Sequence, residues 1–395
     1  MSQATSRTRR GFIAESAALA TMASAPWRAF AAESPERGPA ASDLFAADVV
    51  REVVRSKPDG NVVLSPVSLQ AALAMAAVGA CGKTREQLQA ALGLPSMEPA
   101  DIHAHFASPM LQASRAVFVR HLPVEPAYAK AVSDGLHAEV RELPDDDGRA
   151  VQIVNDWVDE ATHHRIRHLY DSLPAVPLLL TDAVYLKFRW RRPFDAAKTH
   201  DRPFHRATGG ALPVPMMAAS LAAHAGTCGA GTFIQLPFDG VAGGVDLVLP
   251  RRGVSAEEAL DLTLRAGPDL YPRSDRLDYW TEVDLTLPRL EMRSSMSLVE
   301  AASRAGLADV FSRADLSGIS PGLASSSVGA ILQEAWMKAD EEGVEAAAVT
   351  GVEITGAMMP KMPPLKLVFD RPFALIIRDR NVLFAAVVRD PSIPA

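Results

Sequence analysis

The sequence has very few cysteines, no long apolar run and no extended block of one charge. Only Cys81 and Cys228 occur among 395 residues, which excludes a disulfide scaffold and a cysteine zinc site but leaves one disulfide between them open. No apolar stretch reaches the roughly 20 residues of a membrane-spanning helix, so we expect no membrane partner. The net charge of −7 is spread along the chain, which argues against nucleic acid as a partner.

Motifs that would indicate an enzyme are also missing. The chain has no GxSxG, HExxH or paired-carboxylate motif. The run GACGKT at 79–84 is similar to a phosphate loop, but Ala77 occupies the place of a required glycine, and a helical segment precedes the run instead of a strand. His164 and His168 have the spacing of two metal ligands on a helix and lack a third. We expect no enzymatic activity, no cofactor and no metal.

The composition is that of a globular protein, with 48% apolar and 22% charged residues. The first residues differ from this pattern, because TRRGFI at 8–13 resembles a twin-arginine export motif and AFA at 29–31 offers a small–x–small cleavage site. Glu15 and Arg28 depart from the usual pattern of such signals. We expect a signal peptide at 1–31, a disordered linker at 32–43 and one domain at 44–395, exported to the periplasm or the outside of a bacterial cell.

The segment Asp340–Met359, DEEGVEAAAVTGVEITGAMM, alternates with a period of two. One face consists of Val344, Ala346, Ala348, Thr350, Val352 and Ile354. The other face is more polar, as in a half-buried strand. The many alanines and the three glycines weaken permanent strand structure, so the segment could exist as a loop and still fit between two strands.

This segment resembles the hinge of the serpins, whose pattern is acidic–acidic–Gly–Thr–Glu–Ala–Ala–Ala–x–Thr. The matching residues are Glu341, Glu342, Gly343, Val344, Glu345, Ala346, Ala347, Ala348, Val349 and Thr350, of which Val344 departs from the usual Thr or Ser. The resemblance implies a suicide mechanism, in which a protease cleaves the loop, forms its acyl-enzyme and is trapped as the hinge strand inserts into a large sheet.

The resemblance extends over about 44–391 and is carried by further segments in the family order: 61–73, 178–195, 284–316 and 369–391. It implies an α+β serpin fold, with a large central mixed sheet, two smaller sheets, about eight to nine helices and an exposed reactive-centre loop at about 343–362. It also places the residues around the point where the sheet opens at Ser65, Ser68, Asp182, Trp190 and Gln333. For both serines we expect helix capping and buried hydrogen bonds, because no catalytic partners lie near them in the sequence.

Two of these positions differ from the family. Asp182 stands where the family has an asparagine, and Gln333 where it has a histidine; in the family the two side chains hydrogen-bond across the gap that must open. An amide can donate to a carboxylate, so we expect an altered form of this latch. Loss of the histidine puts the family's pH dependence of opening in doubt.

The resemblance also locates the cleaved bond. Counting Glu341 as the seventeenth residue before it places cleavage between Ala357 and Met358. Ala357 suits the small pocket of an elastase-like protease, and Ile354, Thr355 and Gly356 would contact neighbouring subsites. Cleavage after Met358 is the second alternative and would still suit an elastase-like or subtilisin-like enzyme. Cleavage after Lys361, which would suit a trypsin-like enzyme, is the third.

We therefore expect a monomeric, irreversible inhibitor that forms a covalent complex with a serine protease, with cysteine proteases as a second target class. The alternative is a non-inhibitory serpin that acts as a binding or chaperone-like protein. Such members usually carry bulky, charged or proline residues in the hinge. Ala346–Ala348 and Thr350 argue against this alternative, whereas Val344 and Gln333 leave room for it.

Overall fold

The computed structural model describes residues 41–162, 164, 168, 170–186, 188–267, 281–343 and 363–392. Among them are eight α-helices: α3 (Ala41–Ser56), α4 (Pro66–Gly79), α5 (Gly82–Leu92), α6 (Pro99–Phe106), α7 (Pro126–Leu136), α8 (Asp147–Ala161), α9 (Ala256–Ala266) and α10 (Val299–Ala302). Shorter helical turns are η1 (Ala196–Lys198), η3 (Ser303–Leu307) and η4 (Pro321–Leu323). The apolar spacing of residues 44–54 predicts a first helix there. α3 begins three residues earlier, within the stretch we expected to be a linker, and ends two residues later.

The strands begin with β1 (Val62–Leu64), β2 (Leu111–Arg120), β3 (Ala138–Leu143), β4 (Leu178–Leu186), β5 (His200–His205), β6 (Ala211–Thr227) and β7 (Gly231–Pro237). They continue with β8 (Gly244–Pro250), β9 (Thr281–Pro288), β10 (Leu290–Ser297), β11 (Ala330–Ala339), β12 (Leu365–Val368), β13 (Phe373–Arg378) and β14 (Val382–Val388). The sequence predicts a short buried strand at 62–64 and a strand at 330–339 that leads into the hinge, and β1 and β11 have these bounds.

These strands form two sheets. The five-stranded sheet has the order β10-β11-β4-β2-β3 and is mixed, because β11 runs parallel to β4 and β2 parallel to β3, while the other two pairs are antiparallel. The nine-stranded sheet has the order β1-β14-β13-β8-β7-β6-β9-β12, with β5 paired to β6. This architecture confirms the expected α+β class with a mixed central sheet.

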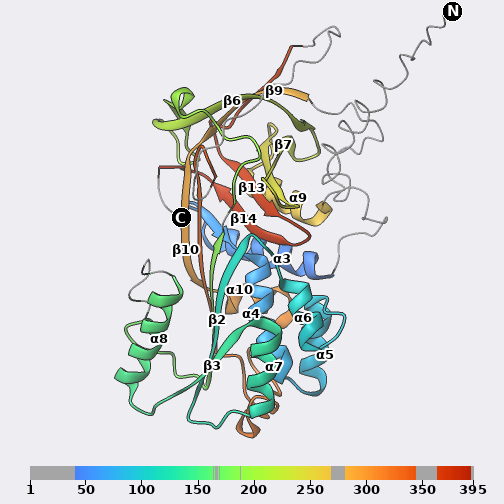
Figure 1. The fold of residues 1–395 in the computed structure, drawn as a ribbon, viewed down its shortest axis with the longest axis vertical. Helices are drawn as coiled ribbons and strands as arrows, with labels where there is room; N and C mark the ends of the chain where they lie inside the picture. The colour runs from blue at the N-terminus through green and yellow to red at the C-terminus, as the bar shows by residue number, and fades with distance from the viewer. Residues whose placement is uncertain are drawn as a thin grey trace, which may run out of the picture. The chain divides into compact units, whose positions relative to one another are not determined.

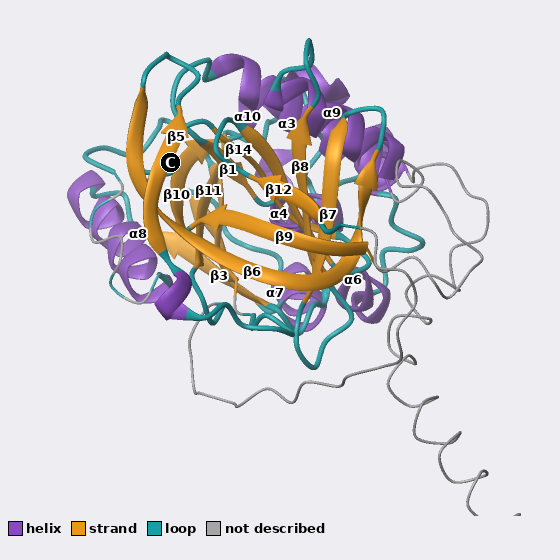
Figure 2. Cartoon of the chain, turned by 90° about the horizontal axis from the view of Figure 1, so that it is seen from above, coloured by secondary structure: helices purple, strands orange, loops and turns teal. Residues whose placement is uncertain are grey.

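The two smaller sheets that we expected are continuous through β6. The first part of this long strand pairs with β5 and β9, and its last four residues, His224–Thr227, pair with β7. β6 therefore belongs to both of the expected smaller sheets and joins them into the single nine-stranded sheet. Figure 2 shows β6 and β9 as two long strands lying side by side, and α3 beside α9.

The five-stranded sheet is covered on both faces. α8 lies on one face and α4 on the other, together with the neighbouring α5, α6 and α7 (Figure 1). Side chains alternate between these faces, as in any strand. On β2, Phe118 packs against Trp157 of α8 with their ring centroids 5.8 Å apart, whereas Val117 and Val119 belong to the main core.

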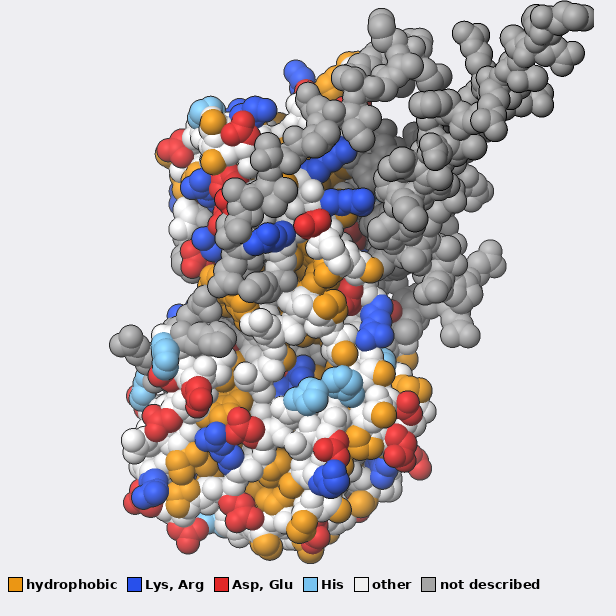
Figure 3. Space-filling model, in the orientation of Figure 1, with side chains coloured by type: hydrophobic (Ala, Val, Ile, Leu, Met, Phe, Trp, Pro, Cys, Tyr) orange, Lys and Arg blue, Asp and Glu red, His pale blue; other side chains and the backbone are white. Residues whose placement is uncertain are grey.

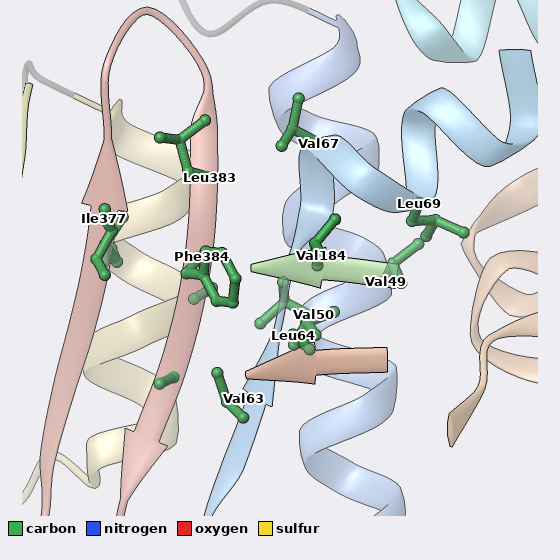
Figure 4. Packing of buried hydrophobic residues seen from close by; sticks show 14 of the residues in the cluster. Val49, Val50, Val63, Leu64, Val67, Leu69, Val184, Ile377, Leu383 and Phe384 are labelled. Carbon is green, nitrogen blue, oxygen red and sulfur yellow. The ribbon is translucent and has the colours of Figure 1, made fainter. Parts of the chain in front are cut away.

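The main core is formed where the two sheets meet around α3 and α4. Figure 4 shows Leu383, Phe384 and Ile377 of the C-terminal hairpin near the valines of α3 and β1. α4 is apolar all round, and nearly every one of its residues is buried, as expected for a helix inside a large core. Burial on all sides fixes this helix beneath β4 and β11.

The surface of the described residues carries interspersed charges. On the face in Figure 3, basic and acidic side chains alternate over short distances. Cys81 and Cys228 are both free thiols, so the disulfide left open by the sequence is not formed. Among the described residues, no helix combines the length and the apolar character needed to cross a bilayer.

Candidate functional site: the seam between β4 and β11

The seam is the pairing of β4 with β11, and it lies in the middle of the five-stranded sheet. The two strands are parallel neighbours from Ala330, opposite Leu179, to Trp336, opposite Tyr185. β11 ends at Ala339 and leads directly into Asp340 and the hinge. A strand that continued the chain after β11 could therefore fold back and enter the sheet at this seam, antiparallel to β11 and to β4.

On the face toward the main core, Gln333 joins the seam to the start of α4. Its side-chain amide donates to the carbonyl oxygen of Ser65 at 2.8 Å, and its side-chain oxygen accepts from the backbone N–H of Ser65, also at 2.8 Å. The Ser65 hydroxyl donates to the carbonyl oxygen of Leu383 at 2.6 Å. Gln333 and Ser65 are almost completely buried, so each of these polar groups depends on its partner.

Asp182 lies opposite Gln333 in the register and forms a buried ion pair with Arg115 of β2. The Arg115 Nε atom donates to Asp182 Oδ2 at 3.1 Å, and Arg115 Nη1 donates to the carbonyl oxygen of Leu136 at 3.1 Å. Burial raises the pKa of Asp182, and the opposing influence of Arg115 and the Ser68 hydroxyl only partly offsets it. The charge pair is thus held at an electrostatic cost.

The direct latch that we expected between Gln333 and Asp182 is replaced by these two separate contacts. The amide of Gln333 is occupied by the backbone of Ser65, and Asp182 Oδ2 by Arg115. The reason is local, because a buried guanidinium needs a carboxylate, and the start of α4 offers Gln333 a free N–H at Ser65. The Ser65 carbonyl oxygen, which also accepts from Leu69 N–H at 3.2 Å, has a second lone pair for the Gln333 amide. Ser65 makes the expected buried hydrogen bond but no side-chain cap, and the Ser68 hydroxyl has no partner of normal geometry.

At the end of the seam, Trp190 holds the start of the hinge. Its indole Nε1 donates to the carbonyl oxygen of Asp340 at 2.7 Å, and its backbone N–H donates to the carbonyl oxygen of Glu342 at 3.3 Å. The indole packs against an aromatic cluster of Phe188, Phe194 and Phe238, with ring centroids between 5.0 and 6.0 Å away. Trp190 is therefore a rigid anchor with one polar contact directed at the hinge.

Glu341 is fixed by two side chains from connecting segments, Arg289 between β9 and β10 and Thr199 between η1 and β5. Its carboxylate accepts from Arg289 Nη2 at 2.7 Å and Nε at 2.9 Å, and from the hydroxyl of Thr199. Burial alone would raise the pKa of Glu341, but the hydrogen bonds from Arg289 and Thr199 outweigh it and lower that pKa. The N–H of Phe194 also donates to the Glu341 carbonyl oxygen at 2.7 Å.

Gly343 is the last described hinge residue, and its backbone requires a glycine. Its φ of 109° lies in the region that other residues rarely adopt. A Cβ atom at this position would lie 2.6 Å from the carbonyl oxygen of Phe188. Gly343 also bridges Arg189 in an antiparallel pairing. The described hinge residues are therefore packed tightly against the segment that follows β4.

Several expected site residues lie outside the described residues. These are the hinge from Val344 to Thr350, the subsite residues Ile354, Thr355 and Gly356, the bond between Ala357 and Met358, and the alternative at Lys361. The histidines considered as metal ligands lie beyond the end of α8 at Ala161 and pair with carboxylates instead: His164 with Asp159 and His168 with Asp171, each at 2.8 Å. No group of three ligands suited to a metal occurs in the described part of the chain.

Sequence reasoning missed three residues that complete this site: Arg115, Thr199 and Arg289. Arg115 had a signal, because the alternation of LQASRAVFVR places it on the same face as Val117 and Val119, where an arginine needs a buried partner. Thr199 and Arg289 contact Glu341 over 142 and 52 positions of sequence. Such contacts between residues far apart in the sequence cannot be recognised before the fold brings them together.

Comparison with known proteins supports the same architecture. The family model described as "Serpin (serine protease inhibitor)" matches residues 40–391. A leukocyte elastase inhibitor of Bos taurus is 30% identical over 89% of this chain and 99% of its own, and serine protease inhibitor 42Dd of Drosophila melanogaster is 29% identical over 85% and 93%.

Solved structures agree with these relatives. Human kallistatin superposes with a TM-score of 0.73 at 26% identity, covering 90% of this chain and 97% of its own. Human thyroxine-binding globulin, solved with its hormone, superposes with a TM-score of 0.74 at 26% identity, covering 89% and 98%. The seam, the hinge that follows β11 and a family match over nearly the whole described chain lead to one conclusion: this protein belongs to the serpins.

Proposed function

We propose that this protein is an irreversible suicide inhibitor of elastase-like or subtilisin-like serine proteases. The protease attacks the bond between Ala357 and Met358 and forms an acyl-enzyme. The freed hinge strand, Val344 onward, then inserts between β4 and β11 and carries the protease with it before deacylation. The observation that supports this most strongly is the seam, where two parallel strands pair directly and one of them leads into the hinge.

The described hinge contacts support the direction of insertion. Asp340, Glu341 and Gly343 are held against Trp190, Arg289 and Arg189 at one end of the seam, so the first inserted residues begin there. Each residue that enters replaces one β4–β11 contact with two, because it pairs with both neighbours. Insertion of about ten residues would add roughly ten net hydrogen bonds of about 1 kcal/mol each, enough to drive a structural change of this size.

The target class rests on Ala357 and on the relatives. A small residue before the bond suits a shallow specificity pocket, and one relative is named a leukocyte elastase inhibitor. Cleavage after Met358 would suit the same enzymes. A cysteine protease that forms a thioester could be trapped by the same movement. We propose that the inhibitor acts as a monomer.

The experiment is incubation of the protein lacking residues 1–31 with pancreatic-type elastase and, separately, with subtilisin. A band that survives denaturing electrophoresis at the summed mass, together with a C-terminal fragment beginning at Met358, is the expected result. Complete cleavage at this bond with the protease still active, for both enzymes, would contradict inhibition of these classes and favour a non-inhibitory serpin. Thyroxine-binding globulin, a family member solved with a small molecule, illustrates that second role.

We further propose that residues 1–31 are a twin-arginine signal and that the folded protein is exported from a bacterial cell. The pair Arg9-Arg10 and the small residues at 29–31 support this. In a bacterium with a functional twin-arginine system, the wild-type precursor should yield processed protein outside the cytoplasm. The double variant Arg9→Lys, Arg10→Lys should remain inside unprocessed. Equal export of both would contradict the assignment.

A further inference from the structure

The second face of the seam, toward α8, contains one charged side chain. The facing pairs are Ala330–Leu179, Leu332–Thr181, Glu334–Ala183 and Trp336–Tyr185. The rings of Trp336 and Tyr185 stack across the seam at 5.1 Å. Glu334 lies between this stack and the Leu332–Thr181 pair, and it is only 2% exposed. A carboxylate at such a position is costly unless it is paired.

Glu334 has no such partner. Neither carboxylate oxygen has a hydrogen bond of normal geometry in the described structure, and the facing residue on β4, Ala183, is apolar. The Oγ1 atom of Thr181, next along β4 on the same face, is also buried without a partner. The seam therefore carries a carboxylate on its α8 face whose burial is offset only in part, in addition to the Asp182–Arg115 pair on its core face.

The titratable and charged groups around Glu334 come from three elements. On β10, the Ser295 hydroxyl and the partly exposed Arg293 favour the charged form of Glu334. From the chain after α8, Tyr170 approaches, and its own pKa is raised to about 12 by burial and by the charge of Glu334. His168 and Asp171 flank Tyr170 and pair with each other. On β11 itself, Lys338 pairs with Asp340 beyond Trp336.

We propose that Glu334 is a proton-dependent lock on the seam: protonated Glu334 favours the closed sheet, and its ionisation loosens β4 from β11. The lock would regulate the proposed insertion of the hinge strand. Only this biological consequence rests on the proposed function, because the opening of the seam can be measured without it. When the seam closes, Glu334 is buried beside Ala183; when the strands part, water reaches the carboxylate. Any state that hydrates this group gains from its charge, and the closed state does not.

The direction of the pH effect follows from proton binding. Burial raises the pKa of Glu334 to about 7, with Ser295 and Arg293 opposing this only in part. The opened seam has an ordinary carboxyl pKa, so the closed seam binds the proton more tightly between about pH 4.5 and about pH 7. Closure is thus strongest at the acidic end of this range and weakens as the pH rises. This is opposite to a salt-bridged carboxylate, whose contribution is lost on acidification.

The test is hydrogen–deuterium exchange of the full mature protein at about pH 5.5 and about pH 8, with each rate divided by its intrinsic rate at that pH. Amides of β4 and β11 should be at least about tenfold less protected at the higher pH. The variant Glu334→Gln, which mimics the protonated group, should be protected equally at both. Glu291→Gln, an exposed glutamate on β10, should behave as wild type. Equal wild-type protection at both pH values, or an unchanged pH dependence in Glu334→Gln, would overturn the lock.

A second measurement separates the lock from the proposed inhibition. A synthetic peptide with the sequence of residues 343–356 should enter the wild-type sheet faster at about pH 8 than at about pH 5.5, and at a pH-independent rate in Glu334→Gln. Entry at the same pH-dependent rate in both proteins would overturn the lock and leave insertion intact. Exchange that depends on Glu334 as described, with no peptide entry at any pH, would uphold the lock and contradict insertion.

Discussion

Gln333 shows how one side chain can connect a sheet to a helix. Its amide group both donates to and accepts from the backbone of Ser65, which is buried. Gln333→Ala leaves the backbone N–H of Ser65 without a partner, while the Ser65 carbonyl oxygen keeps only its bond from Leu69 N–H. The variant should lower the free energy of unfolding by about 1–3 kcal/mol. Urea unfolding followed by circular dichroism measures this. The control is Gln112→Ala, an exposed glutamine of β2 in the same sheet, and an equal loss in both variants would contradict the role of Gln333.

Glu341 has the opposite electrostatic character to Glu334. Its pKa is lowered by Arg289 and Thr199 in spite of burial, so its contribution is present above its ordinary pKa of about 4.3 and is lost as the pH falls below it. Glu341→Gln should cost about 1–2 kcal/mol at neutral pH, because Arg289 is half exposed and water screens part of the pair. Thermal melts of this variant and wild type should converge as the pH falls through the lowered pKa of Glu341.

The matched control for that measurement is Glu342→Gln. Glu342 is the next residue in the hinge and is exposed, so its neutralisation should change stability by less than about 0.5 kcal/mol. If the two variants melt alike at neutral pH, the Arg289 contact does not stabilise the hinge.

At the scale of elements, the alternation of the hinge makes a prediction that depends on one residue of register. Ala348 falls on the face with Val344 and Val352, which would be buried after insertion, and Ala347 on the polar face. Ala348→Arg should convert the inhibitor into a substrate, whereas Ala347→Arg should still form the covalent complex. The stoichiometry of inhibition of elastase measures both. If Ala348→Arg trapped elastase as efficiently as wild type does, the register assumed for the inserted strand would be wrong by one residue.

Sequence reasoning predicted elements better than their connections. β1 and β11 could be bounded because each is a short apolar or alternating run between clear breaks. The continuity of the second sheet could not, because it depends on β6 changing partners partway along its length. The same limit applies to the site. The hinge and Trp190 carry sequence patterns, but the contacts of Gln333, Asp182 and Glu341 depend on distant residues.

Glu334 is an instructive miss at this scale. In the strand AILQEAWMKA, the period of two places it with Leu332 and Trp336, so the pattern alone contained a charge on a largely apolar face. A charged residue at this position is equally typical of the solvent-exposed face of an edge strand. Only the position of β11 between β4 and β10, under the chain that follows α8, makes it a buried group.

At the scale of the whole molecule, the uncut protein is expected to be less stable than its cleaved form. Insertion after cleavage would fill the seam with roughly ten hydrogen bonds, which for a chain of this size corresponds to a rise in melting temperature of roughly 13 °C. Differential scanning calorimetry of the protein before and after clean cleavage near Ala357 measures it. An unchanged melting temperature would indicate a serpin whose strand does not insert. Protein nicked within its N-terminal 40 residues is the control and should melt as the intact protein does.

The pairing of β1 with β14 also constrains how the molecule is made. Val62 is registered with Val387, 325 positions later in the chain, and translation at about 5–20 residues per second separates the two by roughly 15 to 65 seconds. During that time β14 has not yet been made, so β1 lacks its pairing strand and the apolar start of α4 is not covered by it. A growing chain of this protein therefore needs protection until its last strand leaves the ribosome, and a premature stop before Val382 would remove the strand against which both β1 and β13 pair.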